Sequence, residues 1–112
     1  MSRSATLHRA ADRVLQIELA MRRTQLWHEQ PPTPAAMASR MPFCADTLMF
    51  SQWLQFVFLP RMHMLIEANQ PLPESSNIGP MAEHCLPATA GRQQLLDAIR
   101  AFDDLIAADT AS

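Results

Sequence analysis

The sequence is poor in the residues that β-rich folds and phosphate-binding loops need. Among its 112 residues there are two glycines, Gly79 and Gly91, and no tyrosine. Strands favour aromatic residues, and tight hairpin turns depend on glycine. Two isolated glycines also cannot form the glycine-rich loops that bind nucleotides. These absences argue against a β-sheet protein and exclude a P-loop or a dinucleotide-binding fingerprint.

Cysteine is equally scarce, and its spacing matches no motif for metal binding or redox chemistry. The two cysteines are Cys44 and Cys85. His84 precedes Cys85, but neighbouring side chains on a helix point about 100° apart, so His84 cannot serve as its base. We therefore interpret Cys85 as a small apolar core residue. The glycine-flanked serine motif of many hydrolases is also absent, and we expect no catalytic residue.

The four histidines do not make up a metal site by their spacing. No two of them are separated by three or four residues. His63 and Glu67 do have such a spacing, but one pair falls short of the three or four protein ligands that zinc requires. We interpret this pair as a surface hydrogen bond or ion pair, and we expect no metal and no cofactor.

Strong charge and long apolar runs are missing as well. The net charge of -2 predicts no broad attraction to nucleic acid or membrane surfaces. No run of about 18 apolar residues could span a membrane, and residues 1–13 do not resemble a signal peptide. We expect a cytoplasmic protein. Its 48% hydrophobic and 18% charged residues are typical of a globular chain, and its length is that of one domain.

What the chain does contain is helical periodicity, interrupted by prolines. Leu95, Ile99, Phe102 and Ile106, for example, recur every three or four residues and define one face of a helix. Proline-rich segments separate such patterns. We predict an all-α, four-helix bundle-like single domain over residues 1–112 with a proline-broken central helix. Its helices are expected at about residues 5–29, 46–59, 60–68, 80–86 and 92–108.

The central segment, residues 46–67, is apolar around most of its circumference, which is typical of a buried helix. Asp46 and Thr47 are candidates to cap its start. Pro60 lacks a backbone N–H, so we expect a new short helix to begin there.

Trp53 and Arg61 are the strongest candidates for a functional role in this segment, because tryptophan and arginine are favoured as interface anchors. Arg61 has a structural alternative, which is to cap carbonyl groups freed by Pro60. The neutral Gln52 and Gln55, together with His63, complete the candidate interaction surface or pocket.

Several strings in and around this segment resemble the YqcC-like family, small bacterial proteins that contain a domain of unknown function. They are Trp53-Leu54-Gln55, Leu59-Pro60-Arg61-Met62-His63 and Asn69-Gln70-Pro71-Leu72-Pro73. The resemblance extends over nearly the whole chain. One departure is Gln52, where family members often carry an acidic residue. The resemblance implies an all-helical bundle-like fold and no established activity. Family genes tend to neighbour a gene for a tRNA pseudouridine synthase, and this association suggests an accessory role for that enzyme or for tRNA modification.

Two functional hypotheses follow from these observations. The first is a non-enzymatic helical interaction module with a protein partner, which the resemblance suggests is a tRNA pseudouridine synthase. The alternative is a small-ligand-binding protein or enzyme with a pocket near Trp53, Arg61 and His63. Direct binding of RNA is disfavoured by the acidic balance of charge.

Overall fold

The computed structural model describes the backbone of residues 3–111 and the side chains of residues 5–109. Within these residues the chain forms helices and no strand, so the predicted all-α fold class is confirmed. The elements are α1 (Arg3–Arg23), α2 (Pro34–Met37), the 3₁₀-helix η1 (Pro42–Cys44), α3 (Phe50–Trp53), the π-helix η2 (Leu54–Phe58), α4 (Leu59–Glu67), α5 (Ile78–Cys85) and α6 (Arg92–Ala111).

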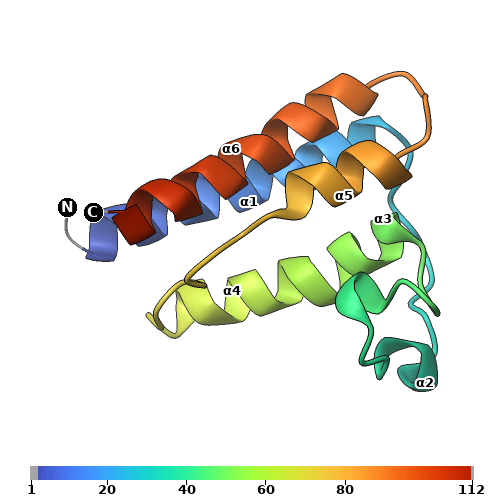
Figure 1. Ribbon diagram of the computed structural model, residues 1–112, viewed down its shortest axis with the longest axis horizontal. Coiled ribbons are helices and arrows are strands. Elements are labelled where there is room, and N and C mark those ends of the chain that lie inside the picture. Colours follow the sequence, from blue (N-terminus) through green and yellow to red (C-terminus); the bar gives the residue numbers. More distant parts are fainter. Residues whose placement is uncertain (1–2, 112) are drawn as a thin grey trace.

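The two long helices α1 and α6 lie side by side and antiparallel, with both chain ends at the same end of the molecule (Figure 1). Helix α5 packs on α6, and α4 packs on α1. The core lies between these helices. The predicted stripe of α6 is confirmed, because Leu95, Ile99, Phe102 and Ile106 are all fully buried. None of the helices in the described part of the chain has the length and hydropathy needed to cross a membrane.

Helix α1 ends at Arg23, six residues earlier than predicted. Gln25 adopts a left-handed conformation with φ of 61°. The Leu26 N–H donates to the Met21 carbonyl at 3.1 Å, and the Gln25 N–H donates to the Arg22 carbonyl at 3.4 Å. This pair of bonds is a Schellman motif, which commonly ends a helix at glycine. Because glutamine and not glycine occupies the left-handed position, the end of α1 could not be predicted from residue type.

The chain beyond α1 is fixed to the central helix by Gln55. The Gln55 side chain accepts from the His28 N–H at 2.7 Å and donates to the His28 carbonyl at 2.8 Å. The ring Nε2 of His28 lies 2.9 Å from Ser51 Oγ. Gln55 is 7% exposed, so both bonds are largely shielded from water. The segment that follows the Schellman motif is therefore part of the packed structure.

The central helix begins at Phe50 and not near Asp46 as predicted. The side chains of Asp46 and Thr47 are used elsewhere: Asp46 accepts from the Ser39 hydroxyl, and Thr47 donates to the Ala36 carbonyl at 2.6 Å. Neither caps a helix. They instead hold the proline-rich connection around α2 against the turn before α3.

The backbone stays helical from Phe50 to Glu67, so no separate helix begins at Pro60. The departure from α geometry comes just before the proline, at η2, where the Leu59 N–H donates to the Leu54 carbonyl five residues back. A proline ring clashes with the carbonyl four residues before it in a regular α-helix. The wider π turn accommodates Pro60 within a continuous helix.

Helix α5 begins at Ile78, two residues before the predicted start, because a distant carboxylate caps it. Asp103 on α6 accepts from the Ile78 N–H at 3.1 Å, from the Gly79 N–H at 2.7 Å and from the Ser76 hydroxyl at 2.6 Å. A carboxylate at the start of a helix accepts hydrogen bonds from free N–H groups, and its negative charge interacts favourably with the helix dipole. Helix α6 also runs three residues further than predicted, to Ala111.

Candidate interaction site

A mainly apolar pocket opens where the central helix faces the segment before α5. Its volume is about 230 Å³. Aromatic and aliphatic side chains from the central helix, η1, α5 and α6 form its walls, and the 75–77 segment contributes polar groups. The lining residues are Phe43, Trp53, Phe58, Arg61, Met62, Pro73, Ser75, Ser76, Asn77, Ile78 and Phe102. Arg61 is the one charged residue among them.

The π turn explains how Trp53, Phe58 and Arg61 come to share this pocket. On a regular α-helix, residues five apart lie roughly 140° apart around the axis and residues eight apart roughly 80°. One extra residue in the turn reduces these separations to roughly 40° and 20°. The Trp53 and Phe58 ring centroids are accordingly 5.6 Å apart. Single π turns often occur at functional sites.

Phe43 forms the wall opposite the central helix and is held there by an unusual backbone. Its φ is 60°, and the φ of the next residue, Cys44, is 49°. Such left-handed conformations are costly for residues other than glycine. They place the Phe43 ring edge-on to Trp53, with centroids 4.7 Å apart. This strained turn has no counterpart in the periodicity of the sequence and was not predicted.

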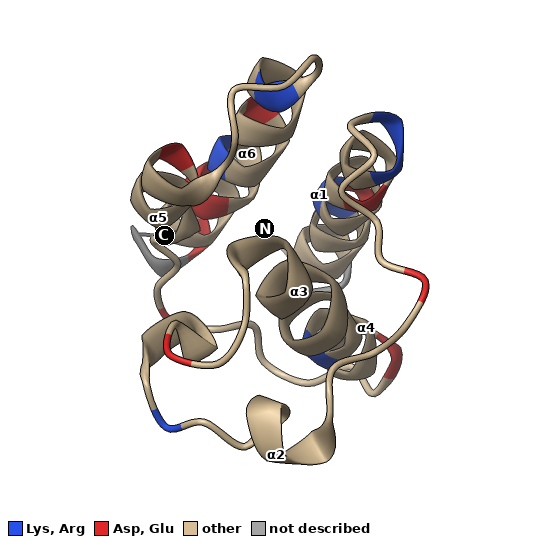
Figure 2. Ribbon diagram, turned by 90° about the vertical axis from the view of Figure 1, so that its right-hand side faces the viewer, with Lys and Arg blue, Asp and Glu red and all other residues tan. Residues whose placement is uncertain are grey.

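Arg61 lies exposed at the rim of the pocket. It makes no hydrogen bond or ion pair with any residue that the structure describes, so it does not cap the carbonyl groups near Pro60. The segment that precedes α4, α3 with η2, carries no charged residue, whereas α1 and α6 each carry both acidic and basic residues (Figure 2). The site thus combines an apolar cavity with one free guanidinium group.

The other three candidate residues do not line the pocket. His63 is exposed on α4. Gln52 accepts from the Met49 N–H at 2.9 Å at the start of α3, and Gln55 is bonded to His28. The structure therefore brings Trp53 and Arg61 together and leaves His63, Gln52 and Gln55 outside the site. The side chains of the two glutamines hydrogen-bond to backbone groups of Met49 and His28.

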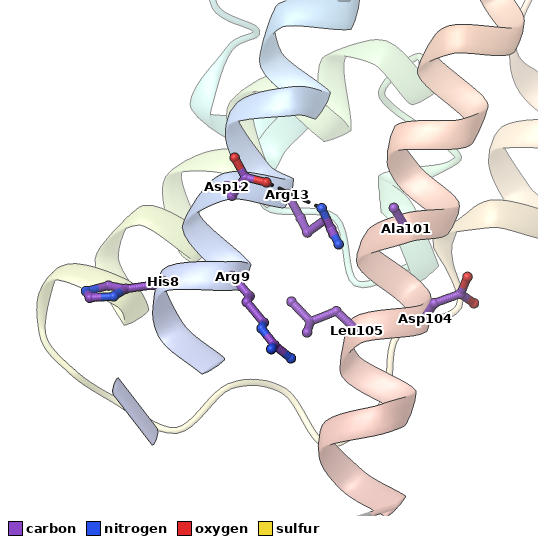
Figure 3. A pocket seen from close by; sticks show the side chains of 7 residues that line it. All are labelled: His8, Arg9, Asp12, Arg13, Ala101, Asp104 and Leu105. Carbon is purple, nitrogen blue, oxygen red and sulfur yellow. Dashed lines mark hydrogen bonds and ion pairs between the residues drawn. The ribbon is translucent and has the colours of Figure 1, made fainter. Parts of the chain in front are cut away.

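A second, more open hollow of about 590 Å³ lies between α1 and α6 (Figure 3). Arg9 and Arg13 extend from α1 toward Ala101 and Leu105 of α6. Arg13 pairs with the adjacent Asp12 at 3.3 Å. The lining carries charges of both signs on a solvated face. Ligand-binding pockets are mostly apolar with few polar groups, and the hollow between α1 and α6 lacks that character.

The histidine, cysteine and acidic side chains are dispersed over the region that the structure describes. No three histidine, cysteine or acidic residues of that region are grouped closely enough to hold a metal ion. Cys44 is buried, whereas Cys85 is exposed, so the interpretation of Cys85 as a core residue was wrong. Cys85 is the last residue of α5 and is exposed at the end of the stripe formed by Ile78 and Ala82.

Comparisons with known proteins place the chain in a family. An uncharacterised protein of Haemophilus influenzae is 37% identical over 90 residues, which are 80% of this chain and 85% of that protein. The uncharacterised protein YqcC of Escherichia coli is 35% identical over 96 residues, 86% of this chain and 88% of that one. The solution NMR structure of YqcC has a TM-score of 0.80 and 34% identity, and the match covers 96% of this chain and 92% of that one.

A relative of a different kind carries the name of an enzyme. A tRNA pseudouridine synthase C of Pectobacterium carotovorum is 46% identical over 59 residues, which are 53% of this chain but 16% of that protein. The family model DUF446, described as "tRNA pseudouridine synthase C", matches residues 9–105. Together with the two relatives that match over most of their length, this establishes that the chain belongs to the DUF446 family, which includes YqcC.

Proposed function

We propose that this protein is a non-enzymatic interaction module that binds a tRNA pseudouridine synthase through the pocket formed by Trp53, Phe58 and Arg61. The observation that carries the proposal is the 59-residue match within a tRNA pseudouridine synthase C. A module joined to an enzyme in one polypeptide stays at high effective concentration beside it. The separate chain would supply the same module by binding.

The size of the pocket favours a protein partner over a small ligand. Pockets for drug-sized molecules measure about 300–1,000 Å³, and the 230 Å³ cavity is smaller. A cavity of this size suits a single side chain. Interfaces concentrate their binding energy in such small pockets filled by one anchor residue, often near tryptophan and arginine.

The arrangement of side chains also favours binding over catalysis. The pocket contains one charged group, Arg61, and no histidine, cysteine or carboxylate. Histidine, cysteine and carboxylate groups are common acids, bases and nucleophiles, and the two serines in the lining have no such group beside them in the lining to act as their base. The small-ligand or enzyme alternative therefore has less support from the geometry.

Isothermal titration calorimetry of the purified chain with the tRNA pseudouridine synthase C of the same organism tests the proposal. We expect a saturable complex of defined stoichiometry that persists in size-exclusion chromatography. Replacing Arg61 with Gln should weaken the complex. Arg23→Gln is a matched control. Arg23 is an exposed arginine at the C-terminal end of α1, does not line the pocket and makes no ion pair with another described residue.

Absence of any heat or co-elution at concentrations up to about 100 µM, with both proteins folded by circular dichroism, would contradict the proposal. A Kd above that value corresponds to less than about 6 kcal/mol of binding free energy. An affinity that weak is too low for a dedicated accessory subunit.

A further inference from the structure

We infer that the pocket receives one apolar side chain of a protein segment that also carries a carboxylate, which pairs with Arg61. This inference rests on the proposed function and specifies the chemistry that the partner must present at the same site. It commits to an acidic, apolar peptide segment and not to nucleic acid, a membrane or a second copy of this chain.

The apolar walls of the cavity indicate that the side chain it receives is apolar. Trp53 is half-buried, and its indole packs with the rings of Phe43, Phe50 and Phe58 at centroid distances of 4.7, 6.0 and 5.6 Å. Phe58 in turn packs edge-on against Phe102 at 5.1 Å. This cluster presents a preformed apolar surface, and covering it with an apolar group is favourable.

Charge complementarity indicates that the bound segment carries a carboxylate. Arg61 is the one charged residue that lines the cavity, and the described part of the chain offers it no acidic partner. A guanidinium group pairs with a carboxylate through two parallel hydrogen bonds and holds it in a defined direction. Beside an apolar pocket, such a pair fixes the register of a bound segment. Phosphate backbones, by contrast, are bound by several basic residues that neutralise several charges.

The polar side of the pocket offers a place for the backbone of the segment. Ser75 and Asn77, which lie on the connection before α5, are exposed and line the cavity. Ser76 is committed to Asp103 at 2.6 Å. Exposed hydroxyl and amide groups at the rim suit an extended peptide, because its N–H and C=O groups need partners when water is displaced.

Selection from a random peptide library displayed on phage tests the chemistry without assuming the synthase. The chain is immobilised through Cys85, whose exposed thiol lies on α5 outside the pocket lining. We expect enriched peptides to share a large apolar residue within two positions of Asp or Glu. Their affinity should fall about tenfold or more in Arg61→Glu, as for an anchor contact, and should be unchanged in Arg23→Glu.

Tryptophan fluorescence supplies a second readout that does not depend on the library. In Trp27→Phe, Trp53 is the one tryptophan left in the chain. Adding an enriched peptide should shift the emission of Trp53 to shorter wavelength. Enriched peptides without an acidic residue, equal enrichment on Arg61→Glu, or an emission shift with oligouridylate in place of peptide would each overturn the inference. Binding of the synthase with equal affinity by wild type and Arg61→Glu would overturn the inference and the assignment of the pocket as the interface, and would leave the accessory role for the synthase standing.

Discussion

At the scale of single residues, the polar side chains near the start of the central helix hold the fold, whereas Arg61 makes no hydrogen bond or ion pair with a described residue. Gln55, Gln52 and Ser51 are all committed to contacts within the chain. Arg61 is not. From the sequence Gln52, Gln55 and Ser51 looked alike, because each is a neutral polar interruption of an apolar helix. Periodicity does not show that the Gln55 side chain hydrogen-bonds to the backbone of His28, which lies 27 residues earlier in the chain.

Replacing Gln55 with Ala should lower the free energy of unfolding by about 2–3 kcal/mol, since it removes two shielded hydrogen bonds to His28 worth about 1 kcal/mol each and some packing. Gln52→Ala, which removes one exposed bond, should cost under about 1 kcal/mol. Urea unfolding followed by circular dichroism measures both values. Equal losses would show that the Gln55 bonds contribute nothing beyond a surface contact.

The two thiols should differ sharply in reactivity. Cys85 is exposed, and Cys44 is 6% exposed, and thiol reagents need access to the sulfur. Ellman's reagent should modify one thiol rapidly in the folded protein and the second when the protein unfolds. Cys85→Ser should abolish the rapid phase. Two rapid equivalents in the wild type would mean that the turn at Cys44 opens readily.

At the scale of elements, the longer helices were predictable, whereas the short helices α2 and η1 and several helix ends were not. The stripe of α6 follows from spacing alone, because one face of that helix makes the core. The ends of α1 and α4 are Schellman motifs with Gln25 and Asn69 in the left-handed position, and the α5 start depends on Asp103 from another helix. Such ends are determined by tertiary contacts or by a residue that only weakly signals a turn.

The end of α1 gives a direct test of this account. Gln25→Gly should stabilise the protein by about 0.5–1 kcal/mol, because glycine has no penalty at a φ of 61°. Gln16→Gly, at an exposed position within α1, should destabilise it by about 1 kcal/mol. Thermal unfolding distinguishes the two. Destabilisation by both changes would mean that Gln25 contributes through its side chain.

The π turn η2 was the element least predictable from the sequence. Pro60 predicted an irregularity, but the proline alone does not say whether the helix stops, kinks or widens. Widening by one residue is what brings Trp53, Phe58 and Arg61 onto one face. The pair Trp53 and Arg61 could be chosen from residue type, whereas their neighbours Phe43 and Ile78 could not, since they come from other elements.

At the scale of the whole molecule, two long antiparallel helices form a stable support for the shorter central helix and its pocket (Figure 1). The DUF446 fold is shared with YqcC over nearly the full length. A rigid helical support presents a binding site at little entropic cost. This arrangement suits a protein that binds a partner in a fixed orientation.

The proposed role of the Trp53–Arg61 pocket is tested by the Kd of the complex with tRNA pseudouridine synthase C for wild type, Arg61→Gln and Arg23→Gln. We expect saturable binding by wild type, equal binding by Arg23→Gln and an affinity about tenfold weaker for Arg61→Gln, as when an interface anchor is lost. No binding by any of the three folded proteins would contradict the claim of an accessory role. Equal binding by all three would contradict the assignment of the Trp53–Arg61 pocket as the interface.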